Sequence, residues 1–186
     1  MKSNWSTKKL GDITSYTSKG IAPKYMDTMK EGAICVLNQK CNRNFKITYD
    51  YARIHDGNLK KVALEKILMP GDVLINSTGT GTAGRVAQLN NVMKPTTVDG
   101  HMIIMRPTNE VDSLYYGYAL KSKQSIIETL AEGSTGQTEI NRKRLSDEIQ
   151  ISFPNDLKKQ RKIALILYAI DNKIETNNQI NNNLYT

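Results

Sequence analysis

Residues 157–185, LKKQRKIALILYAIDNKIETNNQINNNLY, form an uninterrupted stretch without glycine or proline. Apolar side chains recur in it three and four positions apart, the spacing that lines them up along one side of an α-helix. They are Leu157, Ile163, Ile166, Leu167, Ile170, Ile174, Ile180 and Leu184. At about 1.5 Å per residue this helix is roughly 43 Å long, longer than a small domain is wide. The stretch therefore predicts a long C-terminal helix that needs a partner along its length.

The helix also carries a heptad pattern. One heptad position is shared by Ile163, Ile170, Asn177 and Leu184, and Ile166 and Ile180 occupy the partner position. An asparagine in such a seam lowers stability but fixes register, so Asn177 indicates a specified helix pair. The residues expected to contact the partner helix are Ile163, Ile166, Leu167, Ile170, Ile174, Asn177 and Leu184. The alternative is a terminal helix that folds back on its own domain.

Composition limits the classes of protein that fit. The chain has 186 residues, enough for one domain plus an extension, and a net charge of +8. The helical tail holds five Lys and Arg against three Asp and Glu, so most of the positive excess lies in residues 1–153. A basic domain favours a polyanionic partner such as nucleic acid. No apolar run is long enough to span a bilayer, and no secretory segment is visible.

Cysteine and histidine are scarce. Cys35 and Cys41 are too few for a disulfide framework or a zinc site, which favours free thiols in a cytoplasmic protein without a metal. His55 and His101 stand alone, without Cys, Asp or Ser at a useful spacing, and His101 is a candidate structural residue or DNA contact. We expect no catalytic site.

Residues 1–153 predict an α+β domain with a mixed sheet. Apolar, β-branched segments predict strands at 31–37, 71–76, 96–105 and 148–153, and helical spacing predicts helices at 56–70 and 113–130. Polar or glycine-rich loops fall at 38–46, 77–84 and 133–138.

Two of these loops carry side chains suited to nucleic acid. Residues 38–46, NQKCNRNFK, combine three cations, four amides and an aromatic ring with no acid. Residues 77–84, STGTGTAG, offer hydroxyls and close backbone approach to phosphates or base edges, with Arg85 next to them. An ordinary polar loop and a plain hairpin turn remain the alternatives.

Several enzyme motifs are excluded. Gly79, Gly81 and Gly84 match GxGxxG, but a dinucleotide site also requires a long helix after the third glycine and an acidic residue about twenty positions on. Pro95 comes too soon for that helix, and the region near Ile104 offers no acid. A Walker A motif and a methylase-type Asn/Asp-Pro-Pro-aromatic element are absent from the sequence. Asp171 and Lys173 faintly resemble a nuclease motif, but they lie in the helical stretch, on different faces.

Three further stretches together carry a family resemblance: GDVLINSTGTGTAGRV at 71–86, GSTGQTEIN at 133–141, and FPNDLKKQRKI at 153–163, continuing to DNKIETNN at 171–178. In their order and spacing the chain resembles the specificity subunit of type I restriction-modification systems over nearly its whole length. One departure is Asn155, where the family usually has a second proline after the one that matches Pro154.

The resemblance implies a target-recognition domain at residues 1–153 and a spacer or dimerisation helix at 154–186. It implies a DNA-reading protein without enzymatic activity, whose partners are double-stranded DNA, methylase subunits and a restriction motor subunit. S-adenosylmethionine and ATP would belong to those partners. A complete member has two such units, so the chain is either a half-subunit that forms a homodimer or a fragment.

Candidate DNA contacts follow from the loops and from the resemblance. They are Lys19, Lys24, Lys40, Asn42, Arg43, Lys46, Asn76, Thr78, Thr80, Arg85, His101, Thr135, Gln137, Asn141, Arg142 and Lys143. The competing hypotheses are a protein-interaction module that docks through its helix without a DNA role, and a small RNA-binding protein. A steep fall in affinity with salt would separate phosphate binding from helix docking.

Overall fold

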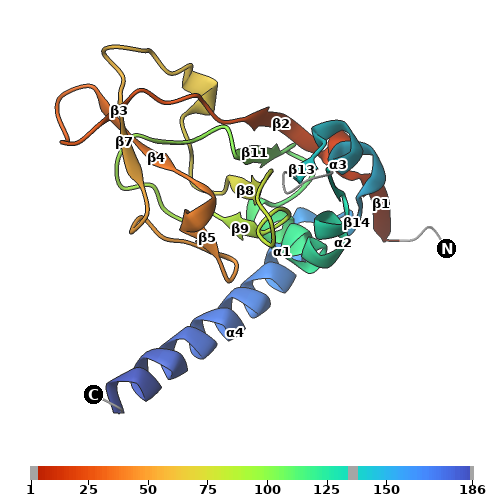
Figure 1. Cartoon of the computed structure of the whole chain (residues 1–186). Coiled ribbons are helices and arrows are strands. Elements are labelled where there is room, and N and C mark those ends of the chain that lie inside the picture. The colour runs from red at the N-terminus through yellow and green to blue at the C-terminus, as the bar shows by residue number, and fades with distance from the viewer. Residues whose placement is uncertain (1–3, 134–137, 185–186) are drawn as a thin grey trace.

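The computed structural model describes residues 4–133 and 138–184. A layered domain of sheets and short helices occupies the chain up to β14, and one long helix, α4, extends away from it (Figure 1). The predicted α+β class with a long C-terminal helix is confirmed. The predicted domain boundary, between residues 153 and 154, falls at the last residue of strand β14 (Gln150–Pro154), and helix α4 (Leu157–Leu184) begins three residues later.

The central sheet is antiparallel and has the order β2-β11-β8-β9. Its strands are β2 (Thr14–Lys19), β11 (Met102–Pro107), β8 (Val73–Asn76) and β9 (Val86–Gln88). Successive side chains of a strand point to opposite faces. Ile103 and Met105 accordingly belong to one buried cluster, and Met102 and Ile104 belong to another. The sheet is therefore covered on both faces.

A second sheet, with the order β10-β4-β7-β3, makes the fold mixed. Its strands are β10 (Thr96–Val98), β4 (Ala33–Leu37), β7 (Arg53–Asp56) and β3 (Tyr25–Met26). β10 and β4 run parallel, whereas β4–β7 and β3–β7 are antiparallel. Leu37 and Val98 pack here with Leu74, Met102 and Ile104 of the central sheet.

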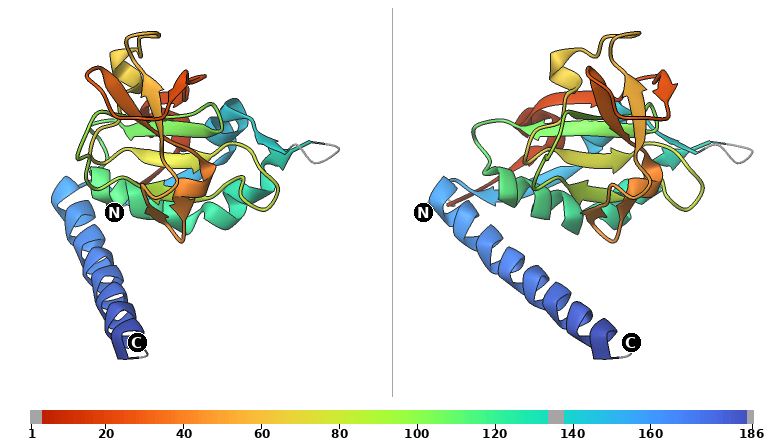
Figure 2. Two further views of the ribbon diagram at one scale, coloured as in Figure 1. Left: turned by 60° about the vertical axis from the view of Figure 1, so that its left-hand side comes forward. Right: turned by 90° about the vertical axis from the view of Figure 1, so that its left-hand side faces the viewer.

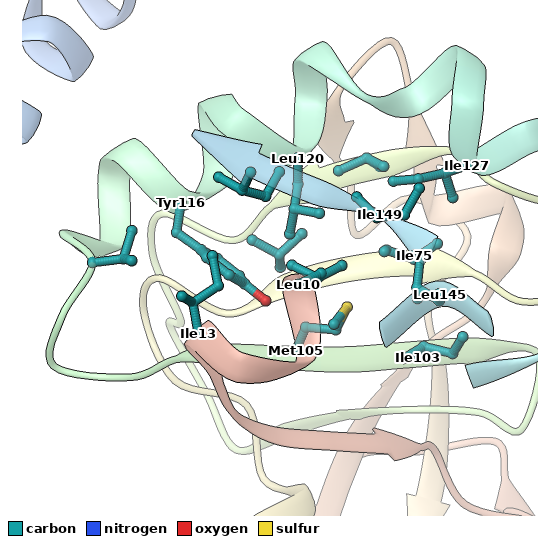
Figure 3. Packing of buried hydrophobic residues seen from close by; sticks show 14 of the residues in the cluster. Leu10, Ile13, Ile75, Ile103, Met105, Tyr116, Leu120, Ile127, Leu145 and Ile149 are labelled. Atoms are coloured by element: carbon teal, nitrogen blue, oxygen red, sulfur yellow. The ribbon is translucent and has the colours of Figure 1, made fainter. Parts of the chain in front are cut away.

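The other face of the central sheet carries the helices. They are α1 (Ser113–Ser122), α2 (Gln124–Thr129) and α3 (Arg142–Glu148), with the 3-10 turn η1 (Leu10–Ile13). Their apolar side chains meet those of β8 and β11 in the larger cluster (Figure 3). Inside it the Tyr116 hydroxyl lies 2.7 Å from Thr14 Oγ1, so this buried phenol is hydrogen bonded.

Short elements complete the domain. β1 (Trp5–Lys9) pairs with β14, β5 (Asn42–Arg43) pairs with β6 (Lys46–Ile47), and β12 (Ala131–Glu132) pairs with β13 (Glu139–Ile140). Two further 3-10 turns are η2 (Gln39–Cys41) and η3 (Leu64–Lys66). The pairing of β1 with β14 brings the two ends of the domain together.

Two helix predictions need correction. The helix expected at 56–70 is wrong: β7 runs to Asp56, whose carboxylate accepts the N–H groups of Asn58 and Leu59 and turns the chain. The only helical turn found in that range is η3, whose residues are not buried, and Leu64 in it is 87% exposed. The helix expected at 113–130 is divided into α1 and α2 at Lys123.

The base of α4 is anchored by a buried amide. Gln160 Oε1 accepts the backbone N–H of Asp112 at 2.7 Å, and its Nε2 donates to the carbonyls of Glu110 and Pro154 at 3.1 and 2.8 Å. Gln160 and Ala164 are fully buried, whereas apolar residues farther along the helix are exposed. The first turns of the helix are therefore buried against the domain, and the helix extends away from it toward its C-terminal end (Figure 2).

Candidate nucleic-acid interface

A polar depression of about 450 Å³ forms where five segments of the domain meet. Lys19 lines it from the end of β2, and Gln39 lines it from η2. Thr78 and Gly79 come from the loop after β8, and Gly100 and His101 come from the turn before β11. Glu139 belongs to β13, and Thr138 directly precedes that strand. These segments are strand ends, loops and one 3-10 turn, where side chains are free to face a ligand.

A second depression, of about 380 Å³, continues from the first and shares Gln39 and His101 with it. It adds Lys40 and Arg53, and the half-exposed rings of Tyr25 and Tyr51. The guanidinium carbon of Arg53 lies 3.3 Å from the centre of the Tyr25 ring, a stacked arrangement that fixes the cation at the surface.

A third depression extends the surface along the β12–β13 hairpin, which projects from the domain (Figure 2). It shares Lys19 and Glu139 with the first and adds Asn141, Arg142 and Lys143. We call the three together the polar surface. Its lining residues are Lys19, Tyr25, Asn38, Gln39, Lys40, Tyr51, Arg53, Thr78, Gly79, Asp99, Gly100, His101, Glu132, Thr138, Glu139, Ile140, Asn141, Arg142 and Lys143.

The glycine loop between β8 and β9 forms one wall of this surface. Gly79, Gly81 and Gly84 all have positive φ, so the chain turns there in a way that other residues rarely adopt. The N–H groups of Thr82 and Ala83 bond to the Gly79 carbonyl, at 3.0 and 2.9 Å. Strand β9, not a helix, follows the loop. The exclusion of a dinucleotide site therefore agrees with the structure.

Two of the predicted contacts lie beneath the surface. Asn42 and Asn76 are both fully buried. The amide of Asn42 donates to the carbonyl of Arg85 at 2.9 Å, and that of Asn76 donates to the carbonyl of Gln39 at 3.1 Å. These amides connect η2, β5 and the glycine loop to one another, so they hold the surface in shape and do not face a ligand.

Four of the predicted cations lie at the polar surface, and the other four lie elsewhere. Lys19 pairs with Glu139 within the polar surface, and Lys40, Arg142 and Lys143 are exposed there. Lys24 is exposed in the β2–β3 connection, Thr80 is exposed in the glycine loop, and Arg85 donates to the Gly81 carbonyl. Asn141 caps α3 by accepting the N–H of Lys143 at 2.8 Å. Thr135 and Gln137 lie outside the described residues.

Arg43 and Lys46 stand apart from the polar surface, in the β5–β6 hairpin beside α4. Lys46 pairs with Glu175 of α4, and its hydrogen bond holds the pKa of Glu175 below the ordinary carboxyl range. Phe45 lies 4.8 Å from the ammonium of Lys121, which in turn contacts Asp171 of α4 at 2.6 Å. The segment 38–46 therefore serves two sites: its first half lines the polar surface and its second half braces the helix.

The hydroxyl of Tyr118 also donates to Asp171, at 3.0 Å. Burial, followed by this bond and the negative charge of Asp171, raises the pKa of Tyr118 well above its ordinary value. The phenol thus stays protonated and remains a donor to the helix carboxylate.

Sequence reasoning missed Tyr25, Tyr51 and Arg53 as surface residues. Arg53, the first residue of β7, does stand two positions after Tyr51 of the preceding turn, so a cation and an aromatic residue are close in the sequence. That signal was available, but the partner Tyr25 is brought in by the β3–β7 pairing, which the sequence does not display.

The predicted partner-helix residues form an apolar stripe on α4. Ile163 is partly buried against the domain core. Ile166, Leu167, Ile170 and Ile174 are 62%, 40%, 51% and 53% exposed, and Asn177 is exposed next to them. Leu184 ends the helix, and its side chain lies outside the described ones. From Ile166 to Ile174 the stripe is exposed, and no described part of the chain buries it.

Within the described ranges, no cluster of three or more His, Cys, Asp and Glu side chains could hold a metal ion. No described helix combines the length and apolar character needed to cross a membrane.

Comparison with known proteins gives a consistent family. The family described as "Type I restriction modification DNA specificity domain" matches residues 2–186. The type I restriction enzyme MjaVIII specificity subunit of Methanocaldococcus jannaschii is 27% identical over 178 residues, which are 95% of this chain and 38% of that protein.

Two solved structures share the fold. The S subunit of a type I restriction-modification system from M. genitalium superimposes with a TM-score of 0.65 and 21% identity, over 94% of this chain and 41% of that one. A structure described as underlying complex assembly and conformational transition of the type I R-M system gives a TM-score of 0.66 and 18% identity, over 95% and 40%. The chain thus spans about two fifths of the length of these relatives.

Proposed function

The chain belongs to the family of type I restriction-modification DNA specificity domains, and from that premise we propose that it reads one half of a two-part DNA site through its polar surface. The observation that carries the proposal is the continuity of that surface. Cations, amides, hydroxyls and aromatic rings from separate loops line three adjoining depressions. Base edges are recognised by this mixture of donors, acceptors and apolar groups.

Charge supports the same assignment. The chain carries a net charge of +8, and Lys40, Arg53, Arg142 and Lys143 stand at the polar surface. Cations of this kind neutralise phosphates and set the register of the protein on the duplex, while the amides and hydroxyls between them face the bases. Lys19 is held by Glu139 and so acts as a positioned donor.

The long helix α4 joins two recognition units. Its exposed apolar stripe pairs with the helix of a second domain-helix unit, which is either a second copy of this chain or another unit of a longer subunit. Two recognition domains are then held a fixed distance apart, and their DNA half-sites are separated by a gap. The chain's share of its relatives' length, about two fifths, fits one such unit.

The partners follow from the family. The paired units recruit methylase subunits and a restriction motor subunit, and S-adenosylmethionine and ATP bind to those partners. This chain contributes recognition and assembly, and no catalytic step.

Binding of the assembled complex to duplex DNA tests the proposal. We expect affinity to fall steeply as salt rises, with a slope that becomes shallower by about one unit for each lost phosphate contact. Lys40→Ala and Arg53→Ala should weaken binding, whereas Lys173→Ala, which removes the same charge from exposed α4, should not. Binding that ignores salt and both surface variants would favour a protein-interaction module that docks through the helix.

A further inference from the structure

A buried aspartate fixes the ring of His101 at the centre of the polar surface. The side chain of His101 is 62% exposed, whereas that of Asp99 is only 8% exposed. One carboxylate oxygen of Asp99 accepts the backbone N–H of His101 at 2.9 Å, and the other lies 3.1 Å from ring atom Nδ1. The same carboxylate thus holds both the backbone and the side chain of the histidine.

The turn that carries this pair is itself held on several sides. The N–H of Asp99 donates to the Leu37 carbonyl at 2.9 Å, and the His101 carbonyl accepts the N–H of Ser77 at 2.8 Å. Gly20 passes so close that a Cβ atom there would lie 2.1 Å from the Val98 carbonyl oxygen. The imidazole is therefore positioned by strands of both sheets and not by a mobile loop.

The carboxylate of Asp99 determines whether the exposed ring nitrogen of His101 donates or accepts a hydrogen bond. An ionised carboxylate only accepts hydrogen bonds, so in the neutral ring the proton sits on Nδ1. Nε2, on the far side of the ring from Asp99, is then an acceptor. Gln39 and Thr78 line the depression beside it, but each of them offers both a donor and an acceptor. In contrast, the exposed Nε2 of neutral His101 can only accept a hydrogen bond.

We propose that His101 reads the exocyclic amino group of a base, N6 of adenine or N4 of cytosine, and that Asp99 is the positioning residue that selects this preference. In the major groove only these two bases present an amino donor, and guanine and thymine present acceptors at the equivalent place. The proposal rests on the function proposed above, because it requires the polar surface to meet base edges.

Asp99→Asn gives the sharpest test because it keeps the shape of the side chain and moves the proton of the His101 ring from one nitrogen to the other. The asparagine oxygen can still accept the His101 N–H, while its NH₂ group donates to Nδ1 and moves the ring proton to Nε2. At one position of the site, the preference should then move from adenine or cytosine toward guanine or thymine, by about tenfold. His101→Ala should abolish the preference at that same position and leave the others unchanged.

The measurement is the base preference of the full chain, assembled with its partner subunits, on a randomised duplex library. Asp56→Asn is the matched control, since Asp56 also accepts N–H groups in a turn, those of Asn58 and Leu59, but holds no histidine against a ligand surface.

The outcomes separate the two proposals. A wild-type complex without any base preference overturns the proposed function. A wild-type preference that survives in both Asp99→Asn and His101→Ala overturns the role of His101 alone. A uniform loss of affinity in His101→Ala, with every base preference intact, identifies a phosphate contact and also overturns it.

Discussion

Replacing Gln160 by methionine should loosen the attachment of α4 to the domain. Methionine has a similar length but cannot form the three hydrogen bonds that Gln160 makes to Asp112, Glu110 and Pro154. Gln160 is fully buried, so its former backbone partners lose their bonds away from water. Each such unmade bond costs about 1 kcal/mol, so the three together give a loss of roughly 3 kcal/mol in the free energy of unfolding.

Urea unfolding followed by circular dichroism measures this loss as a lower transition midpoint. Gln179→Met is the matched control, because Gln179 lies on the exposed part of α4 and makes one long bond, 3.3 Å, to Glu175. We expect its stability to change by less than about 0.5 kcal/mol. If the two variants unfold at the same urea concentration, the amide of Gln160 does not anchor the helix and the reasoning fails.

Three further predictions follow from other contacts. Ile170→Glu with Ile174→Glu should leave a folded chain that no longer pairs through α4, because both side chains are about half exposed and contribute little to the domain core; light scattering would show a monomer, and an unchanged dimer contradicts the pairing face. The Lys46–Glu175 bond lowers the pKa of Glu175, so its contribution to stability is present above the ordinary carboxyl pKa and is lost as the pH falls through the lowered value; wild type and Lys46→Ala should therefore converge in thermal stability at acid pH, and a constant difference would refute the pair. Gly84→Ala should destabilise more than Gly81→Ala, because both have positive φ but only at Gly84 would a Cβ atom meet backbone, 2.6 Å from Glu128 Cα; urea midpoints in the reverse order would contradict that packing.

Elements with an unbroken apolar pattern were predictable from the sequence. The unbroken apolar spacing of residues 157–184 identified α4, and β-branched runs identified β4 and β8. Short elements were not, because their conformation depends on distant partners. The segment after Asp56 has apolar residues at helical spacing, yet the Leu68 N–H bonds to the Thr96 carbonyl and holds the chain extended. Helix α3 was missed because only one of its residues, Leu145, is buried, so it shows no repeating apolar pattern.

The candidate surface was only partly predictable for the same reason. The glycine loop and residues 38–40 were identified from their composition, but burial of Asn42 and Asn76 depends on how η2 packs against that loop. The sequence places Asp99 two positions from His101, which is common in turns. The structure shows that Asp99 is buried and aligned with the ring, so the interpretation of His101 as a histidine without an aspartate partner was wrong.

Selection from randomised duplex DNA by the wild-type assembly tests the central claim most directly. If the domain reads bases and α4 holds two units apart, the selected sequences should contain two short elements separated by a gap of constant length, inverted copies of one another in a homodimer. Selected sequences with no common element, or with a single element and no fixed gap, would contradict the account.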